Sequence, residues 1–122
     1  MYRLTVKKFM NKNNFYSECL ANLKTVFNGS AMEVSSIEGN IVITSKDGVN
    51  GNWIDIILTF DDDKVKIEGC TDGCLVSSKS IQNYGNPESI YDDFDDLYES
   101  IRECIATVYG EINAEIMSGM FN

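Results

Sequence analysis

The side chains able to do chemistry in this 122-residue chain are four cysteines and many carboxylates, because the sequence contains no histidine. Without an imidazole there is no Ser-His or Cys-His pair, and the usual general base is missing. Catalysis by carboxylates alone needs two acids that converge in an apolar cleft. The acids here fall on predicted turns or on one helical face. We therefore expect no catalytic residue, no cofactor and no enzymatic activity.

The four cysteines are expected to be free thiols rather than a disulfide framework. Cys19 and Cys104 fall on the apolar faces of two predicted helices, where cysteine behaves as a small hydrophobic residue. Cys70 and Cys74 flank a tight turn at 71–73 and are predicted to face each other across a hairpin, which leaves open whether they are bonded. Zinc ligands usually come as closely spaced pairs. Because the other two cysteines are scattered, we predict no metal site.

The carboxylates are concentrated near the C-terminus. Residues 81–122 contain nine acids and one base, Arg102, whereas residues 1–80 contain ten acids and nine bases. The net charge of −9 therefore comes mainly from one segment. Its densest part runs from Asn86 to Glu103 and reads NPESIYDDFDDLYESIRE.

This acidic segment predicts the start of a long C-terminal helix. Asn86 is a preferred N-cap and Pro87 suits the first helical position. The helical pattern continues to Met117, with Gly119 as a terminator and Gly110 as a point where the helix either bends or divides. One face is apolar and is expected to pack on the rest of the protein. It comprises Ile90, Phe94, Leu97, Ile101, Cys104, Val108, Ile112 and Ile116.

The opposite face of this helix is acidic and forms the predicted partner-binding surface. Like charges three or four residues apart cost about 0.2–0.5 kcal/mol per pair, and a face that served only solubility would include lysines. Two tyrosines one heptad apart lie on its flank, where they either anchor an interface or edge the core. The predicted site residues are Asp92, Asp96, Glu99 and Glu103, the flanking Asp93 and Asp95, and the tyrosines Tyr91 and Tyr98.

The rest of the chain predicts strands and a second helix. Residues 2–8 alternate as in a half-buried strand, and Asn13 or Asn14 is a candidate cap of a helix that ends before Gly29. Four or five short alternating segments follow between Ala31 and Ile81. We predict one α+β domain, 1–122, in which an antiparallel β-meander of four to five strands packs against an N-terminal and a long C-terminal helix.

The small size, this order of elements and the run YDDFDDLYES resemble small acidic phage-encoded inhibitors, including anti-CRISPR proteins and other DNA mimics. The resemblance implies a stoichiometric protein antagonist, for example of a Cas effector. The charge spacing points independently to a surface that binds the cationic groove of a nucleic-acid-binding protein or nuclease. Six carboxylates over about 16 Å of helix give one per roughly 2.7 Å, against about 1.7 Å for duplex DNA and 3.4 Å for one strand. An acidic surface argues against direct nucleic-acid binding.

Three other interpretations remain open. An immunity protein that neutralises a basic toxin nuclease would carry the same kind of acidic surface. A secretion-chaperone-like or structural adaptor is the second, because an apolar tail either pairs two protomers as a homodimer or packs on the sheet. In the third, the acidic face docks internally on Arg3, Lys7 and Lys8. The residues of the tail are Ile112, Ile116, Met117, Met120 and Phe121.

The sequence also predicts a compartment. The first residues contain no apolar signal segment, and no stretch approaches the roughly 18 apolar residues that a membrane span needs. We therefore expect a cytoplasmic protein of a bacterial or phage-infected host cell that makes no contact with a membrane.

Overall fold

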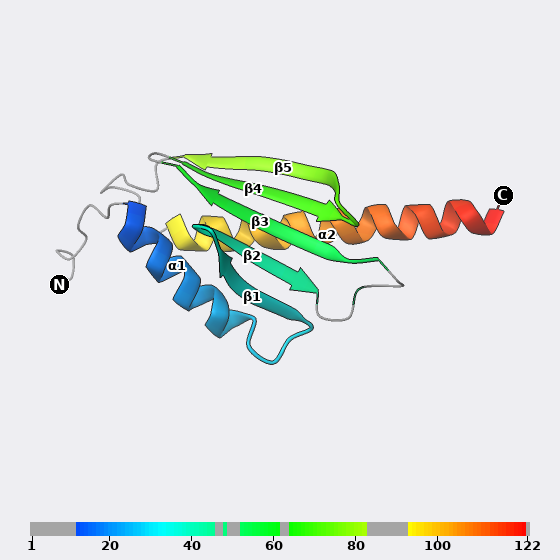
Figure 1. The fold of residues 1–122 in the computed structure, drawn as a ribbon. Coiled ribbons are helices and arrows are strands. Elements are labelled where there is room, and N and C mark those ends of the chain that lie inside the picture. Colours follow the sequence, from blue (N-terminus) through cyan, green and yellow to red (C-terminus); the bar gives the residue numbers. More distant parts are fainter. Residues whose placement is uncertain (1–11, 46–47, 49–51, 62–63, 83–92, 122) are drawn as a thin grey trace.

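The computed structural model describes residues 12–45, 48, 52–61, 64–82 and 93–121, which are coloured in Figure 1. A helix, a five-stranded antiparallel sheet and a second helix follow one another, so the predicted α+β fold is confirmed. The strand predicted at residues 2–8 and the helix start predicted at Asn86 and Pro87 lie outside the described residues. The elements are α1 (Lys12–Val26), β1 (Met32–Ile37), β2 (Asn40–Ser45), β3 (Ile54–Phe60), β4 (Lys64–Thr71), β5 (Cys74–Gln82) and α2 (Asp93–Phe121).

The sheet is a simple meander in which each strand pairs with the next, in the order β1-β2-β3-β4-β5. Two of its hairpins close with two-residue turns, Glu38-Gly39 and Asp72-Gly73, whose φ angles are all positive, between 49° and 84°. Positive φ at both central residues is the geometry of a type I′ turn, which matches the twist of paired strands and favours glycine at the second position. The local sequence therefore sets the register of both hairpins.

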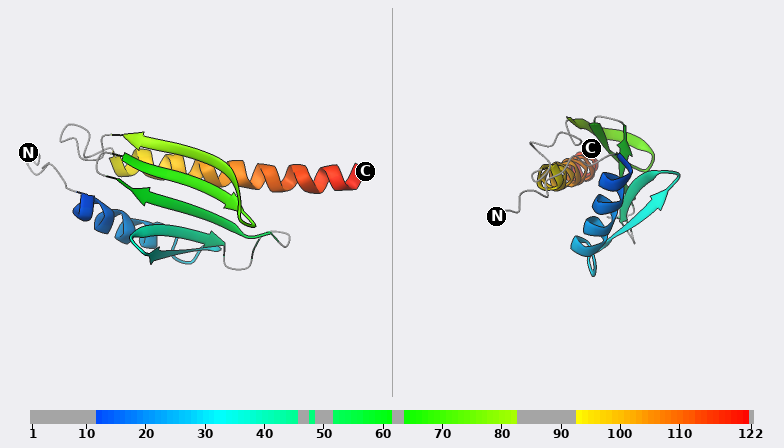
Figure 2. Two further views of the ribbon diagram at one scale, coloured as in Figure 1. Left: turned by 45° about the horizontal axis from the view of Figure 1, so that its top comes forward. Right: turned by 90° about the vertical axis from the view of Figure 1, so that its left-hand side faces the viewer.

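One face of the sheet carries the core. Along β3, Ile54, Ile56, Leu58 and Phe60 are buried, whereas the residues between them are only partly buried. The period of two follows from the pleat, which sends successive side chains to opposite faces. Both helices lie over the same face of the sheet, as the end-on view in Figure 2 shows.

Helix α1 packs through Phe15, Cys19 and Leu23. It already includes Asn13 and Asn14, so the prediction that one of them caps the helix from outside was wrong. The end of the helix agrees with the sequence: after Val26 the chain turns, and Gly29 adopts a φ of 79°. A left-handed glycine just after the last turn is a common way to satisfy the terminal carbonyls.

Helix α2 packs mainly on β4 and β5 and less extensively on β3. It approaches β4 closely at Gly69, where a Cβ atom would lie 2.5 Å from the Sγ atom of Cys104 and 2.8 Å from a methyl carbon of Val108. The helix continues through Gly110 and Gly119 to Phe121, so Gly110 does not divide it and the prediction that Gly119 ends it was wrong. Helix propensity costs about 1 kcal/mol per glycine and does not by itself end a helix.

The C-terminal turns of α2 extend past the end of the sheet (Figure 1). Among the residues described, neither helix combines the length and the apolarity that crossing a bilayer requires.

Candidate partner-binding surface

The acidic surface is positioned by the packing of the opposite side of α2. Leu97, Ile101 and Val108 are at most 1% exposed and fix the rotation of the helix on the sheet. With that side buried, a row of acids spaced four residues apart faces solvent. We call Asp95, Glu99 and Glu103 the acidic ridge; all three side chains are exposed.

The other predicted site residues are placed less completely. Asp93 and Asp96 belong to α2, but their side chains are outside the described part of the structure, as are Tyr91 and Asp92 as a whole. Glu99 and Glu103 lie on the exposed side of α2, and Asp95, which the sequence placed on the flank, is the third exposed acid of the row. The proposed internal docking on Arg3, Lys7 and Lys8 also lies outside the described residues.

Two cations lie close to the ridge. The Nζ atom of Lys79 on β5 is 3.5 Å from Oε1 of Glu103, and a guanidinium nitrogen of Arg102 is 3.6 Å from Oε1 of Glu99. All four side chains are 55–63% exposed, and an exposed ion pair contributes only about 0–1 kcal/mol. The two ion pairs therefore orient the side chains of the acidic ridge but are too weak to prevent another cation from binding there. Sequence reasoning missed Lys79, because only the β4–β5 register places it beside α2.

Tyr98 on α2 contacts Phe27, the residue that directly follows α1. Its ring is 6.2 Å from Phe27 in an edge-on arrangement and 6.2 Å from Phe94 in a stacked one. The guanidinium of Arg102 lies 5.9 Å from the centre of the same ring. The residue is partly buried against the core. Of the two roles that the sequence left open, the described contacts are those of an aromatic side chain that edges the core.

Cys70 and Cys74 are both free thiols. The sequence predicted that they face each other across the hairpin, and this prediction was wrong. The two-residue turn pairs Thr71 with Cys74, which leaves Cys70 opposite Leu75. Burial, followed by the nearby carboxylates of Glu68 and Asp55, raises the pKa of the Cys70 thiol. The thiolate is the metal ligand and nucleophile, so this environment disfavours both roles.

Elsewhere in the described chain, no three metal-binding side chains lie close enough together to hold an ion.

Cys104 is buried between α2 and the sheet, and burial raises the pKa of its thiol. A hydrogen bond with the Ser77 side chain acts in the opposite direction but is the smaller effect.

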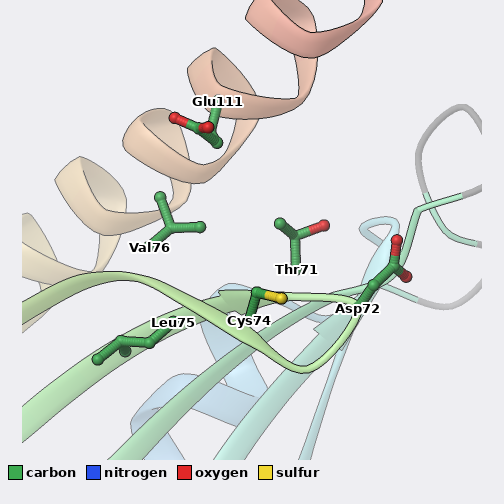
Figure 3. Close-up of a pocket in the computed structure, with 6 residues that line it drawn as sticks. All are labelled: Thr71, Asp72, Cys74, Leu75, Val76 and Glu111. Carbon is green, nitrogen blue, oxygen red and sulfur yellow. The ribbon is translucent and has the colours of Figure 1, made fainter.

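A cavity of about 380 Å³ opens between the β4–β5 turn and α2. It exists because β5 bulges: Gly69 pairs with Ser77 and Cys70 with Leu75, so Val76 has no partner of its own in the ladder. A bulge bends its strand and redirects a side chain, and Figure 3 shows Val76 turned toward α2. The lining residues are Thr71, Asp72, Cys74, Leu75, Val76 and Glu111.

One polar atom of this cavity stands out. The Thr71 side chain is 7% exposed, and its hydroxyl oxygen is buried without a hydrogen-bond partner. An unpartnered buried hydroxyl costs about 1–3 kcal/mol, so such groups are rare in folded proteins. No sequence signal identified this cavity, since it depends on the bulge and on the position of Glu111 above the turn. A second, smaller cavity of about 270 Å³ lies beside the end of α1 and β1.

Comparison of the chain with protein-family models, with curated proteins and with solved structures gives no match in any of the three. The function must therefore be inferred from the surface of the protein itself.

Proposed function

We propose that this protein is a non-catalytic antagonist whose acidic ridge binds the cationic groove of a nucleic-acid-binding protein or nuclease. The observation that carries the proposal is the exposed row of Asp95, Glu99 and Glu103 on a helix held firmly from its other side. A rigid element presents charges at fixed spacing without an ordering cost on binding, which is what a competitor of a nucleic acid requires.

The charge density of the helix supports this proposal. Between Asp93 and Glu103, α2 carries five carboxylates, of which the structure describes three side chains. Over about 15 Å of helix this is one charge per roughly 3 Å, close to the 3.4 Å spacing of phosphates along one DNA strand. A groove that binds phosphates by many lysine and arginine contacts meets a similar charge pattern here. An immunity protein against a basic toxin nuclease would use the same surface, and the identity of the captured target separates the two.

The test compares two triple charge reversals in a pull-down from the native host. The ridge variant carries Asp95→Lys, Glu99→Lys and Glu103→Lys, and the control carries Glu18→Lys, Glu33→Lys and Glu38→Lys, which are exposed acids away from α2. Both variants have the same net charge, so a general charge effect is matched.

We expect the wild-type protein and the control to capture a nucleic-acid-binding protein that duplex DNA competes away and that elevated salt releases. The ridge variant should capture none of it, although it remains folded. Inhibition of the captured protein's nuclease or DNA-binding activity then establishes antagonism. Equal capture by both variants would reject the ridge as the binding surface.

A second candidate, a dimeric adaptor, is favoured by the projection of α2 beyond the sheet (Figure 1). The apolar spacing continues there at Ile116 and Met120, four and eight residues after the buried Ile112. Light scattering coupled to size exclusion tests this function. A dimer that the variant Ile116→Glu/Met120→Glu converts to a monomer supports it, and a wild-type monomer rejects it.

A further inference from the structure

We propose that the cavity between the β4–β5 turn and α2 is a pocket for one long basic side chain of the partner, with arginine preferred over lysine. This inference rests on the proposed function, because it names a residue type that the partner must present beside the acidic ridge.

The charge of the cavity selects a cation. Asp72 contributes a carboxylate from the turn and Glu111 contributes a second one from α2, and no basic residue is among the described residues that line the space. In Figure 3 Glu111 projects from α2 and Asp72 lies in the turn, so the two acids belong to different walls. An anionic ligand would meet repulsion from both walls. A metal ion is disfavoured because no three ligating side chains in the described chain converge on one point.

The floor of the cavity provides a third polar partner. Thr71 projects from the sheet toward α2 (Figure 3), and its hydroxyl is buried with no hydrogen-bond partner. A donor that enters the cavity and displaces the atoms covering this oxygen would satisfy it. Asp72 is partly engaged, since its Oδ1 atom accepts the backbone N–H of Trp53 at 3.0 Å. Its other oxygen is left for a ligand.

The shape of the cavity suits a long side chain. Val76, turned toward α2 by the bulge, offers an apolar contact to an aliphatic stem, and the acceptors lie at the walls and the floor. Arginine and lysine both combine such a stem with a cationic end. Arginine is the better match because its planar group has five donors that reach several acceptors at once, whereas the ammonium of lysine is a compact point charge.

The position of the cavity links it to the ridge. Glu103 leans toward β5, where it pairs with Lys79, and Glu111 follows eight residues later. Each step of four residues advances about 6 Å and turns about 40° around the helix, which carries the row of acids from the solvent side toward the β4–β5 turn. A partner whose basic groove covers the ridge would therefore place a neighbouring basic side chain at the pocket.

The experiment is an NMR titration of the full chain with three small probes at fixed ionic strength. The probes are N-acetyl-arginine methylamide, N-acetyl-lysine methylamide and the neutral N-acetyl-norleucine methylamide. We expect the arginine probe to shift the signals of Thr71, Val76 and Glu111 most strongly, the lysine probe less and the norleucine probe hardly at all. Equal shifts with all three probes, or shifts spread over all exposed acids, would overturn the proposal.

Two conservative variants sharpen the test. Glu111→Gln and Thr71→Val should each weaken binding of the arginine probe by at least about fivefold, because the first removes a negative charge and the second removes the hydroxyl acceptor. Glu18→Gln, an exposed acid on α1, is the control and should change nothing. If Thr71→Val alters stability but leaves the affinity for arginine unchanged, the hydroxyl holds only water and the pocket as proposed is wrong.

The proposed pocket and the proposed function of the ridge can be rejected independently of each other. The ridge reversal should leave the affinity for the arginine probe within about twofold, since Asp95, Glu99 and Glu103 do not line the cavity. Loss of partner capture in the ridge variant with intact arginine binding supports both proposals. If probe binding depends on Glu111 but partner capture does not require the ridge, the proposed function is rejected and the pocket is supported. Partner capture that requires the ridge, with no probe binding, rejects the pocket alone.

Discussion

The two sides of α2 follow different rules. On the sheet side, Leu97, Ile101 and Val108 are almost completely buried, and their positions follow from packing density. On the solvent side, Asp95, Glu99 and Glu103 repeat every four residues, and the described contacts of their side chains are ion pairs with two exposed cations. Packing explains the first row, whereas the second row has like charges side by side that slightly destabilise the helix. Substitutions on the two sides should therefore affect stability and binding in opposite proportions.

The largest loss of stability is expected for Ile101→Ala. Ile101 is 0% exposed in the middle of the sheet side of α2, and removing a buried isoleucine side chain typically costs 2–5 kcal/mol, or about 3 kcal/mol here. Urea unfolding followed by circular dichroism measures the change. A loss below about 1 kcal/mol would show that α2 packs less tightly than the buried surface indicates.

A smaller loss of about 1–3 kcal/mol is expected for Gly69→Ala, because the added methyl group overlaps the core. The new Cβ atom would lie 2.5 Å from the Sγ atom of Cys104. Removing that sulfur should relieve part of the overlap, so Gly69→Ala/Cys104→Ala should lose less stability than the two single variants added together. Strict additivity in a double-mutant cycle would contradict the close approach.

Alkaline pH should weaken the same interface. Burial raises the pKa of Cys104 above its ordinary value of 9.0, so the unfolded chain releases this proton at a lower pH than the folded chain does. The stabilising effect is complete below about pH 9 and is lost as the pH rises through the folded pKa, by at most about 1.4 kcal/mol per pH unit for this thiol. Urea titrations from pH 8 to pH 10 should give a shallower fall for Cys104→Ala than for the wild-type protein. Parallel curves would show that the thiol is not protected.

The smallest effect on stability is expected on the acidic side. Neutralising the ridge with Asp95→Asn, Glu99→Gln and Glu103→Gln removes two like-charge contacts of about 0.2–0.5 kcal/mol each and also two exposed ion pairs of similar size. The free energy of unfolding should change by less than about 1 kcal/mol, while capture of a basic partner is lost. A large loss of stability with unchanged capture would reverse the roles assigned to the two sides.

Much of the fold could be predicted because its signals are local. The alternation of Ile54, Ile56, Leu58 and Phe60 identifies a strand with one buried face, and the apolar stripe of α2 identifies its buried side. The Asp72-Gly73 dipeptide similarly specifies a tight turn from two residues alone. The errors lie at element ends, such as Gly119, where burial of a helix outweighs the weak preferences of single residues.

The sequence by itself determined the type and order of the elements and the exposure of Glu99 and Glu103 on one helical face, since side-chain periodicity is a property of a single segment. Only the tertiary structure decided which residues meet between segments. The β-bulge redirected Val76, the strand register placed Lys79 beside Glu103, and the crossing of α2 over the turn set Glu111 above Thr71. These contacts depend on the register and on the packing of the whole core, so no local pattern along the chain encodes them.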